Sequence, residues 1–173
     1  GKRVVFASDR LGGGTFMNSI YSMNADGTAV TRITYPPAGY SDWRPTKVGK
    51  QIAFFRQENS TGRRDIYLVN MDGTGLTPVA EGNAPAGHPR GTHIAYEYLG
   101  DIYVRELATG VTVNVTNTLE FDTDPTFSPG GKQLAYSTSS TGISGINLVN
   151  MDGTGFRPVT SAQFSLHWTP RWS

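Results

Sequence analysis

Three side chains that can bind a metal ion stand at equivalent distances before a recurring proline. The residues third before Pro45, Pro85, Pro125 and Pro170 are, in chain order, Asp42, Gly82, Asp122 and His167. If these prolines mark equivalent strands of a repeat, the repeat brings two carboxylates and one imidazole together. Oxygen ligands with one imidazole suit calcium, manganese or iron better than a structural zinc site. The pattern therefore predicts a divalent cation at Asp42, Asp122 and His167. The alternative is that each Asp bonds its own backbone and that His167 packs beside Trp168.

The same segments are rich in aromatic and acidic residues. The aromatic ones are Tyr35, Tyr40, Trp43, Phe121, Phe164 and Trp168, and the acidic ones include Glu81, Glu120 and Asp124. Exposed Trp and Tyr around a concavity are the usual anchors of peptide or sugar binding. The alternative is that several of these rings pack inside the fold. We predict a surface for a peptide or protein partner, made by Asp42, Trp43, Glu81, Asn83, Phe121, Asp122, Asp124, His167 and Trp168.

Motifs for catalysis are missing from the sequence, so we predict a protein that is not an enzyme. There is no Gly-x-Ser-x-Gly elbow, no His-Glu-x-x-His pair and no cysteine. The two other histidines, His88 and His93, flank a predicted turn, and we expect them on the opposite face from His167. No cofactor is predicted apart from the divalent cation.

Composition excludes further classes of function. The net charge is +1 with acids and bases mixed along the chain, whereas a nucleic-acid binder concentrates Lys and Arg on one face. No apolar stretch approaches the ~20 residues of a membrane span, and the chain shows no signal peptide. Without cysteine there are no disulfides, so the redox compartment stays open.

A repeat of four short strands organises the chain and positions these side chains. A turn followed by an apolar strand begins at Gly1, Gly49, Gly91 and Gly131, so the steps are 48, 42 and 40 residues. A period of about 40–45 residues with four strands per unit is typical of β-propeller blades. The prediction is an all-β protein, one β-propeller domain over residues 1–173 with four blades of four antiparallel strands.

The later strands of the repeat carry turn and edge signals. Asn-x-Asp-Gly-Thr recurs at 24–28, 70–74 and 150–154, and the third repeat has Ala108-Thr109-Gly110 instead. With one carboxylate per loop, this motif predicts hairpin turns rather than calcium loops. Pro78 and Pro158 occupy the strand after the turn, and because proline cannot donate to a ladder on both sides, that strand is predicted at the outer edge of each blade.

The ends of the chain predict how the ring closes. Pro170-Arg171-Trp172-Ser173 repeats the innermost strand, and Gly1 supplies the turn that should follow it. We therefore expect the C-terminal strand to pair with the N-terminal blade, which removes an open sheet edge. The alternative is half of a larger ring, in which the chain is either a piece of a longer protein or is completed by a second copy as a homodimer.

The repeated pattern resembles the WD40-like PD40 repeat of TolB-family β-propellers. It reads Pro-x-[Trp/Phe]-Ser-Pro-x-Gly-Lys-x-[Ile/Leu]-Ala-[Phe/Tyr], then Ile-Tyr-x-x-Asn-x-Asp-Gly-Thr, and it covers essentially the whole chain. Val48 and His88 depart from it at the Ser, and Lys47 and Gly87 at the aromatic. The resemblance implies a bacterial, periplasmic or otherwise extracytoplasmic propeller that binds a partner at one end of its channel. PD40 propellers also resemble metal-dependent oligogalacturonate lyases and the gating propellers of peptidases, which gives the enzyme or carbohydrate-binding alternative.

Overall fold

The protein is all-β. The computed structural model describes residues 3–10, 17–140, 143–163 and 169–172, and these residues form fifteen strands. No helix is found among them, and thus none that is long and apolar enough to cross a membrane. The predicted fold class is confirmed, since short apolar runs between Gly-containing turns fold as antiparallel meanders.

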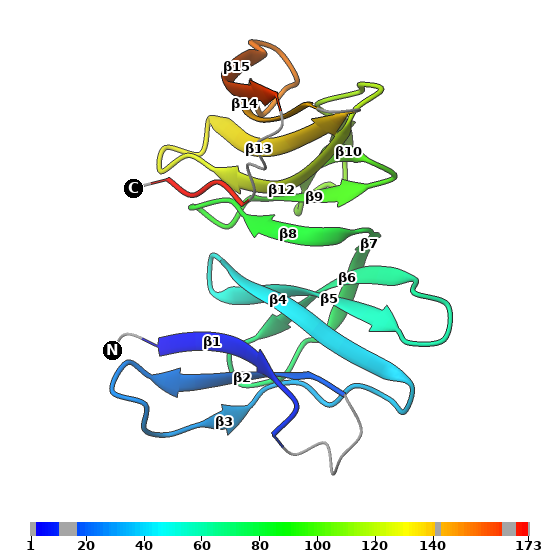
Figure 1. Cartoon of the computed structure of the whole chain (residues 1–173). Coiled ribbons are helices and arrows are strands. Elements are labelled where there is room, and N and C mark those ends of the chain that lie inside the picture. The colour runs from blue at the N-terminus through cyan, green and yellow to red at the C-terminus, as the bar shows by residue number, and fades with distance from the viewer. Residues whose placement is uncertain (1–2, 11–16, 141–142, 164–168, 173) are drawn as a thin grey trace. The chain divides into compact units, whose positions relative to one another are not determined.

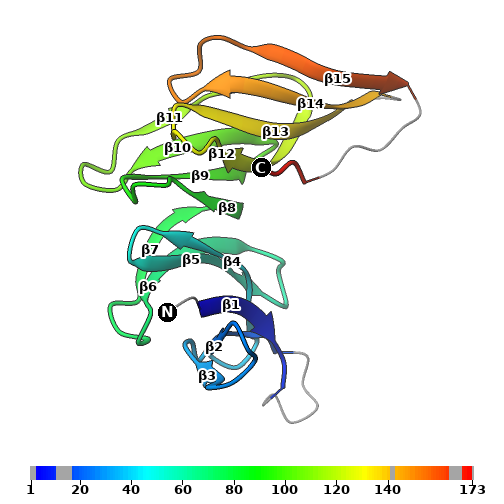
Figure 2. The same ribbon diagram turned by 90° about the vertical axis from the view of Figure 1, so that its left-hand side faces the viewer.

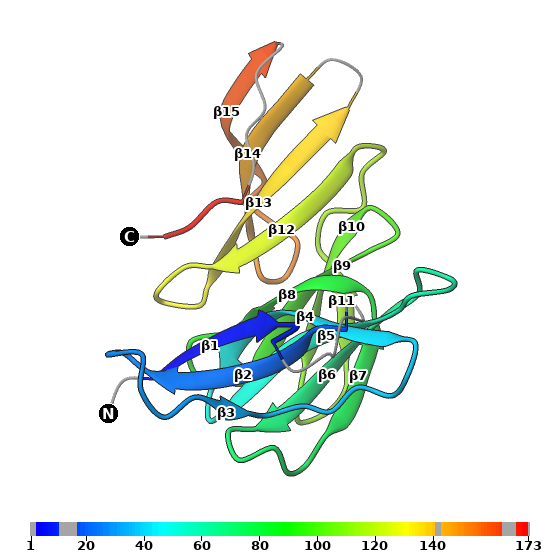
Figure 3. The same ribbon diagram turned by 60° about the horizontal axis from the view of Figure 1, so that its bottom comes forward.

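The described chain divides into two compact units, residues 1–83 and 84–173. The first unit holds a three-stranded sheet in the order β1-β2-β3 and a four-stranded sheet in the order β4-β5-β6-β7 (Figures 1 and 3). Its strands are β1 (Arg3–Ser8), β2 (Ser19–Asn24), β3 (Thr31–Arg32), β4 (Tyr40–Val48), β5 (Gln51–Glu58), β6 (Arg64–Asn70) and β7 (Thr77–Glu81). Strand β4 packs against β1 and β2, so the innermost strand of one sheet covers the preceding sheet.

The second unit repeats this arrangement with two four-stranded sheets, β8-β9-β10-β11 and β12-β13-β14-β15 (Figure 2). Its strands are β8 (Asn83–Gly87, which begins at the last residue of the first unit), β9 (His93–Tyr98), β10 (Asp101–Glu106), β11 (Thr112–Asn114), β12 (Phe121–Phe127), β13 (Gln133–Ser140), β14 (Ile143–Asn150) and β15 (Arg157–Gln163). Strand β12 packs against β9 and β10. Whether the two units form the single predicted propeller domain stays a prediction.

Turn and edge predictions are confirmed. In each Asn-x-Asp-Gly-Thr segment the Asp accepts hydrogen bonds from the Thr two residues later; Asp152 Oδ1, for example, lies 2.9 Å from Thr154 N and 2.7 Å from its Oγ1. The Asp therefore holds a hairpin turn through its own loop. Pro78 lies on β7 and Pro158 on β15, each at the edge of its sheet.

A bulge interrupts two of the innermost strands, β4 and β12, just before the recurring proline. The register shifts between Trp43 and Thr46 in β4 and between Thr123 and Thr126 in β12. The residue before the proline has a φ of 49° at Arg44, 48° at Ala84, 52° at Asp124 and 52° at Thr169. Left-handed backbone at non-glycine residues is uncommon and, next to a shifted register, marks a β-bulge. Ala84 and Thr169 share the left-handed φ of the bulge residues Arg44 and Asp124.

Closure of the ring stays a prediction. The described residues 169–172 are not part of a ladder, and the described part of the first sheet has three strands.

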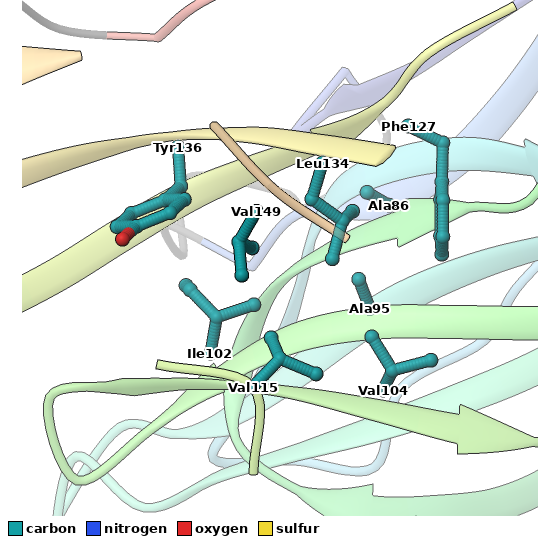
Figure 4. Packing of buried hydrophobic residues seen from close by; sticks show 9 residues of the cluster. All are labelled: Ala86, Ala95, Ile102, Val104, Val115, Phe127, Leu134, Tyr136 and Val149. Carbon is teal, nitrogen blue, oxygen red and sulfur yellow. The ribbon is translucent and has the colours of Figure 1, made fainter. Parts of the chain in front are cut away.

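The core of each unit lies between its two sheets. In the second unit, Figure 4 shows Ala95, Ile102, Val104 and Val115 of the β8–β11 side facing Leu134, Tyr136 and Val149 of the β12–β15 sheet. In the first unit Ile20 and Ile33 pack with Ile52, Phe54 and Val69. Because each sheet packs on a neighbour, its strands are apolar on consecutive residues, as predicted.

Candidate functional site

Asp42, the first predicted metal ligand, forms a buried ion pair. It lies on β4 opposite Arg56 of β5, and its side chain is 0% exposed. Arg56 Nε donates to Oδ1 at 2.6 Å and Nη2 donates to Oδ2 at 2.9 Å. A bidentate guanidinium satisfies both carboxylate oxygens in one plane, so Asp42 stabilises the first unit.

Two aromatic rings hold the Arg56 guanidinium in place. Phe54 and Tyr67 are cross-strand partners whose rings stack with centroids 5.8 Å apart. The Cζ of Arg56 lies 5.8 Å from the Phe54 centroid and 5.1 Å from that of Tyr67, so cation–π attraction adds to the ion pair.

Asp122 has the same position in the second unit but lacks the arginine. Asp122 lies on β12 opposite Thr138 of β13, just as Asp42 lies on β4 opposite Arg56 of β5. Each Asp stands two residues before the residue with left-handed backbone at the bulge. Asp122 is 1% exposed. Thr118 Oγ1 donates to its Oδ2 at 2.9 Å, whereas Oδ1 is buried without a hydrogen-bond partner.

A second difference between the two sheets leaves more space beside Asp122. Asn147 stands opposite Tyr136 on β14, where the first unit has Tyr67 opposite Phe54. The three other sheets have a stacked aromatic pair there: Phe6 with Tyr21, Phe54 with Tyr67, and Tyr96 with Tyr103. Arg56 and Tyr98 stand two residues after Phe54 and Tyr96, at the position of Thr138. In the first sheet that position is Ser8, and Arg10, two residues further on, lies over both rings. Only the β12–β15 sheet has a threonine and an asparagine at these two positions.

A cavity of about 480 Å³ lies in this place, between the segment that joins β11 to β12 and the strands β13–β15. This volume is within the usual range of ligand pockets. Its lining is polar and acidic at one end, where Asp122 and Glu120 meet the hydroxyls of Thr116, Thr118 and Thr138. Val115, Val149, Phe156 and Pro158 supply apolar surface. The described lining residues include no Lys, Arg or His.

The pKa values of two groups that line the cavity, Asp122 and Tyr136, are raised. Burial, together with the charge of nearby Asp101, raises the pKa of Asp122. The hydroxyls of Thr138, Thr118 and Thr116 lower this pKa. Neither Thr138 nor Thr116 makes a hydrogen bond of good geometry to Oδ1. Burial, and then the charges of Asp122 and Glu120, raise the pKa of the Tyr136 hydroxyl, while a hydrogen bond with Asn147 opposes them. Asp101 is satisfied by Asn114, Thr116 and Thr118. Asp122 is therefore the carboxylate with acceptor capacity to spare.

The other predicted site residues are distributed between the units. Trp43 on β4 is partly exposed, and Phe121 on β12 is 53% exposed. Glu81 is exposed at the end of β7, with its carboxylate 3.9 Å from Arg63. Asp124 is buried at the bulge, and Asn83 is half-buried at the start of β8. The structure brings Phe121, Asp122 and Asp124 together on one strand.

The predicted cation site remains a prediction. His167 and Trp168 lie outside the described residues, and Asp42 and Asp122 belong to different units. In the described ranges, no group of three or more His, Asp or Glu side chains is arranged to hold a metal ion.

The two remaining histidines lie on either side of the turn between β8 and β9, as predicted. Their ring centroids are 5.5 Å apart, and His88 packs edge-on against Phe127 at 5.1 Å. Backbone N–H of Arg90 donates to His88 Nδ1 at 3.2 Å. His88 is thus a core residue between two sheets.

Sequence reasoning named Asp122 and Glu120 but missed Thr138 and Asn147. The signal was present in the repeat, because aligning Gly49 with Gly131 places Arg56 beside Thr138, and aligning the two Asn-x-Asp-Gly turns places Tyr67 beside Asn147. The clearer signal is Asn147, because the three other repeats have Tyr21, Tyr67 and Tyr103 at that position.

Four-stranded antiparallel meanders that pack face to face are the blades of a β-propeller. No protein-family model matches the chain. Among sequences, it is 31% identical over 120 residues to a TolB homologue of Chlorobaculum tepidum, which covers 65% of this chain and 27% of the relative. It is also 27% identical over 154 residues to dipeptidyl-peptidase 5 of Porphyromonas endodontalis, covering 79% and 21%. The chain thus spans about a quarter of the length of these relatives.

Solved structures agree on the fold. A putative TolB from Agrobacterium tumefaciens matches with a TM-score of 0.78 at 15% identity, over 99% of this chain and 66% of that one. TolB from Acinetobacter baumannii matches at 0.66 with 20% identity, over 88% and 39%. An oligogalacturonate lyase in complex with manganese matches at 0.56 with 17% identity, over 76% and 40%. The chain is therefore TolB-like, and the resemblance to PD40-repeat propellers is confirmed.

Proposed function

We propose that the chain is a non-catalytic, TolB-like binding module that takes a peptide or protein partner at the cavity beside Asp122. One observation carries the proposal: a place that side chains fill in three sheets is open in the fourth and contains a buried carboxylate oxygen without a partner. Burying a polar group without a hydrogen bond costs free energy, which a ligand can recover.

The rim of the cavity supports a macromolecular partner. Phe156, which lines the cavity, is 60% exposed, and Leu119 and Phe121, the chain neighbours of the lining residue Glu120, are also exposed. Exposed apolar and aromatic side chains around a polar recess are typical of interfaces in which a few anchors supply most of the affinity.

Binding is proposed rather than catalysis because no histidine or cysteine lies beside the cavity carboxylates in the part of the chain that the structure describes. The lyase and peptidase alternatives rest on likeness in fold, which does not fix function. The TolB resemblance favours a bacterial, periplasmic location. The wider partner surface, with Asp42, Trp43, Glu81, Asn83, His167 and Trp168, and the cation at Asp42, Asp122 and His167 remain proposals.

Selection from a random peptide library tests the proposal. Peptides selected on the purified chain are labelled, and their affinity is measured by fluorescence anisotropy. The cavity is then filled with the residues of the third sheet, Thr138→Tyr and Asn147→Tyr, as in Tyr98 and Tyr103. Val159→Tyr is the matched control, because Val159 is exposed on β15 between two cavity-lining residues.

We expect the filled variant to lose at least tenfold in affinity, while Val159→Tyr binds as the unchanged chain does. Equal binding by the filled variant would overturn the proposal, as would a selection that yields no binding peptide.

A further inference from the structure

We propose, resting on the proposed function, that the cavity takes an arginine side chain of the partner, with its guanidinium paired to Asp122. The ligand is identified by what occupies the same place in the first unit. There the guanidinium of Arg56 forms a bidentate pair with Asp42, and the second unit keeps the aspartate but not the arginine.

The geometry of the acceptor is the same in both units. Asp42 and Asp122 occupy the same place before a bulge, and each backbone N–H is fixed by the preceding sheet: Asp42 N donates to Asn18 O at 2.9 Å and Asp122 N to Gly100 O at 2.7 Å. Both carboxylates therefore leave the strand at equivalent positions. Asp122 Oδ1 is buried without a hydrogen bond, and Oδ2 accepts one hydrogen bond from Thr118, so both oxygens have lone pairs left for guanidinium donors once the side chains that cover Oδ1 move aside.

The walls suit a flat cation with a long apolar stem. Tyr136 takes the place of Phe54, one of the two rings beside Arg56 in the first unit. Val115, Val149 and Pro158 line the remainder and can contact the methylenes of an arginine side chain. Asn147 and Thr138 leave the space that Tyr67 and Arg56 fill elsewhere.

The acidic side chains of the cavity favour a cation, and the two oxygens of the Asp122 carboxylate favour a guanidinium over an ammonium group. Glu120 and Asp122 both line the cavity, and no described lining residue is basic. An ammonium is a strongly hydrated point charge, whereas a guanidinium is planar, weakly hydrated and matches a carboxylate with two parallel N–H donors. A desolvated carboxylate with one unsatisfied oxygen therefore favours arginine over lysine.

Matched tripeptides provide the first test. The probes are acetyl-Gly-Arg-Gly-amide and the same peptide with citrulline, which keeps the shape of arginine but has no charge. Binding is followed by amide chemical shifts in NMR titrations. We expect saturable shifts for the arginine peptide at Thr118, Glu120, Asp122, Thr138 and Asn147, with citrulline at least tenfold weaker. Equal affinities for the two peptides would overturn the inference, as would an arginine peptide that shifts none of these amides.

An internal arginine provides the second test. Thr138→Arg recreates the pair of Asp42 with Arg56, so we expect a higher Tm and a loss of arginine-peptide binding. Thr138→Met is the control for length without charge; it should bind the peptide more weakly than the unchanged chain but gain no salt-sensitive stability. Asp122→Asn should remove arginine binding. If Asp122→Asn binds the arginine peptide as tightly as the unchanged chain, the inference is wrong.

The two proposals fail differently. Library peptides that lose affinity on filling the cavity but carry no arginine would leave the binding function intact and overturn the arginine ligand. If library peptides bind equally to the filled variant, the binding proposal falls with the inference that rests on it.

Discussion

Gly131, at the turn between β12 and β13, lies directly against the imidazole of His88. Its φ is +76°, in the left-handed region, and a Cβ there would overlap His88 Nε2. Because His88 is itself wedged against Phe127, the ring has little room to move. This contact joins the two sheets of the second unit at the end of their innermost strands.

Gly131→Ala should therefore destabilise the protein by about 2 kcal/mol or more, from the left-handed backbone and the overlap together. The measurement is urea unfolding followed by tryptophan fluorescence. Gly130→Ala is the control, since nothing lies within 4 Å of its Cβ position, and its effect should stay within about 0.5 kcal/mol. Equal effects of the two substitutions would contradict the contact.

Stability should fall as the pH drops below the ordinary histidine range. Burial, followed by the charges of His93 and Arg90, lowers the pKa of His88 below its usual 6.5. The unfolded chain then binds the proton more tightly than the folded one, so the His88 contribution is complete above pH 6.5 and is lost as pH falls through that value toward the folded pKa. Tm measured between pH 7.5 and 5 should show this slope. His88→Asn should flatten the slope, and His93→Asn should reduce it only in part, because burial is the larger cause of the shift.

Breaking the Asp42–Arg56 pair from one side should strongly destabilise the protein. Asp42→Asn leaves a buried guanidinium without its counter-charge, and breaking a buried pair from one side costs about 3–5 kcal/mol. Chemical denaturation measures the loss. Asp65→Asn, which removes the partly exposed contact of Asp65 with Arg63 at 3.1 Å, should cost less than about 1 kcal/mol. A loss of similar size at both sites would contradict the structural role of Asp42.

In contrast to Asp42→Asn, Asp122→Asn should raise the free energy of unfolding by about 1 kcal/mol at neutral pH. The reason is that a buried polar group without a hydrogen bond costs about that much free energy. The pKa of Asp122 is raised, so the folded state holds the proton more tightly, and stability falls as pH rises from the unfolded value of 3.8 through the folded pKa. The advantage of the variant should thus vanish at low pH. A lower Tm for Asp122→Asn at pH 7 would show that Asp122 is a structural carboxylate.

A divalent cation at Asp42, Asp122 and His167 can be tested by thermal melts after EDTA and after adding back calcium, manganese or zinc. A ligand at 100 times its Kd stabilises the native state by about 2.7 kcal/mol. If the site forms, the midpoint rises with the ion and Asp122→Ala abolishes the rise. An unchanged midpoint with every ion would overturn it.

The fold could be predicted because its signals are local and repeated. Gly-Lys turns, Asn-x-Asp-Gly-Thr hairpins and the edge prolines Pro78 and Pro158 each act within a few residues and agree with one another across the repeats. The site could be predicted only in part. Spacing alone placed Asp42 and Asp122 in equivalent positions, but their roles differ because of the residue across the strand, Arg56 in one case and Thr138 in the other. That difference depends on the cross-strand register, which the spacing of the prolines does not contain.

The common register has a practical consequence for protein engineering. Because Arg56 with Tyr67 and Thr138 with Asn147 stand at the same ladder positions, the pair Arg56→Thr and Tyr67→Asn would open a second pocket above Asp42, at a cost in stability. A scaffold with two such pockets could hold a partner with two suitably spaced arginines, and its avidity would exceed either single affinity without a new kind of contact. Two substitutions would thus add a second receptor site, in the sheet that already holds Asp42.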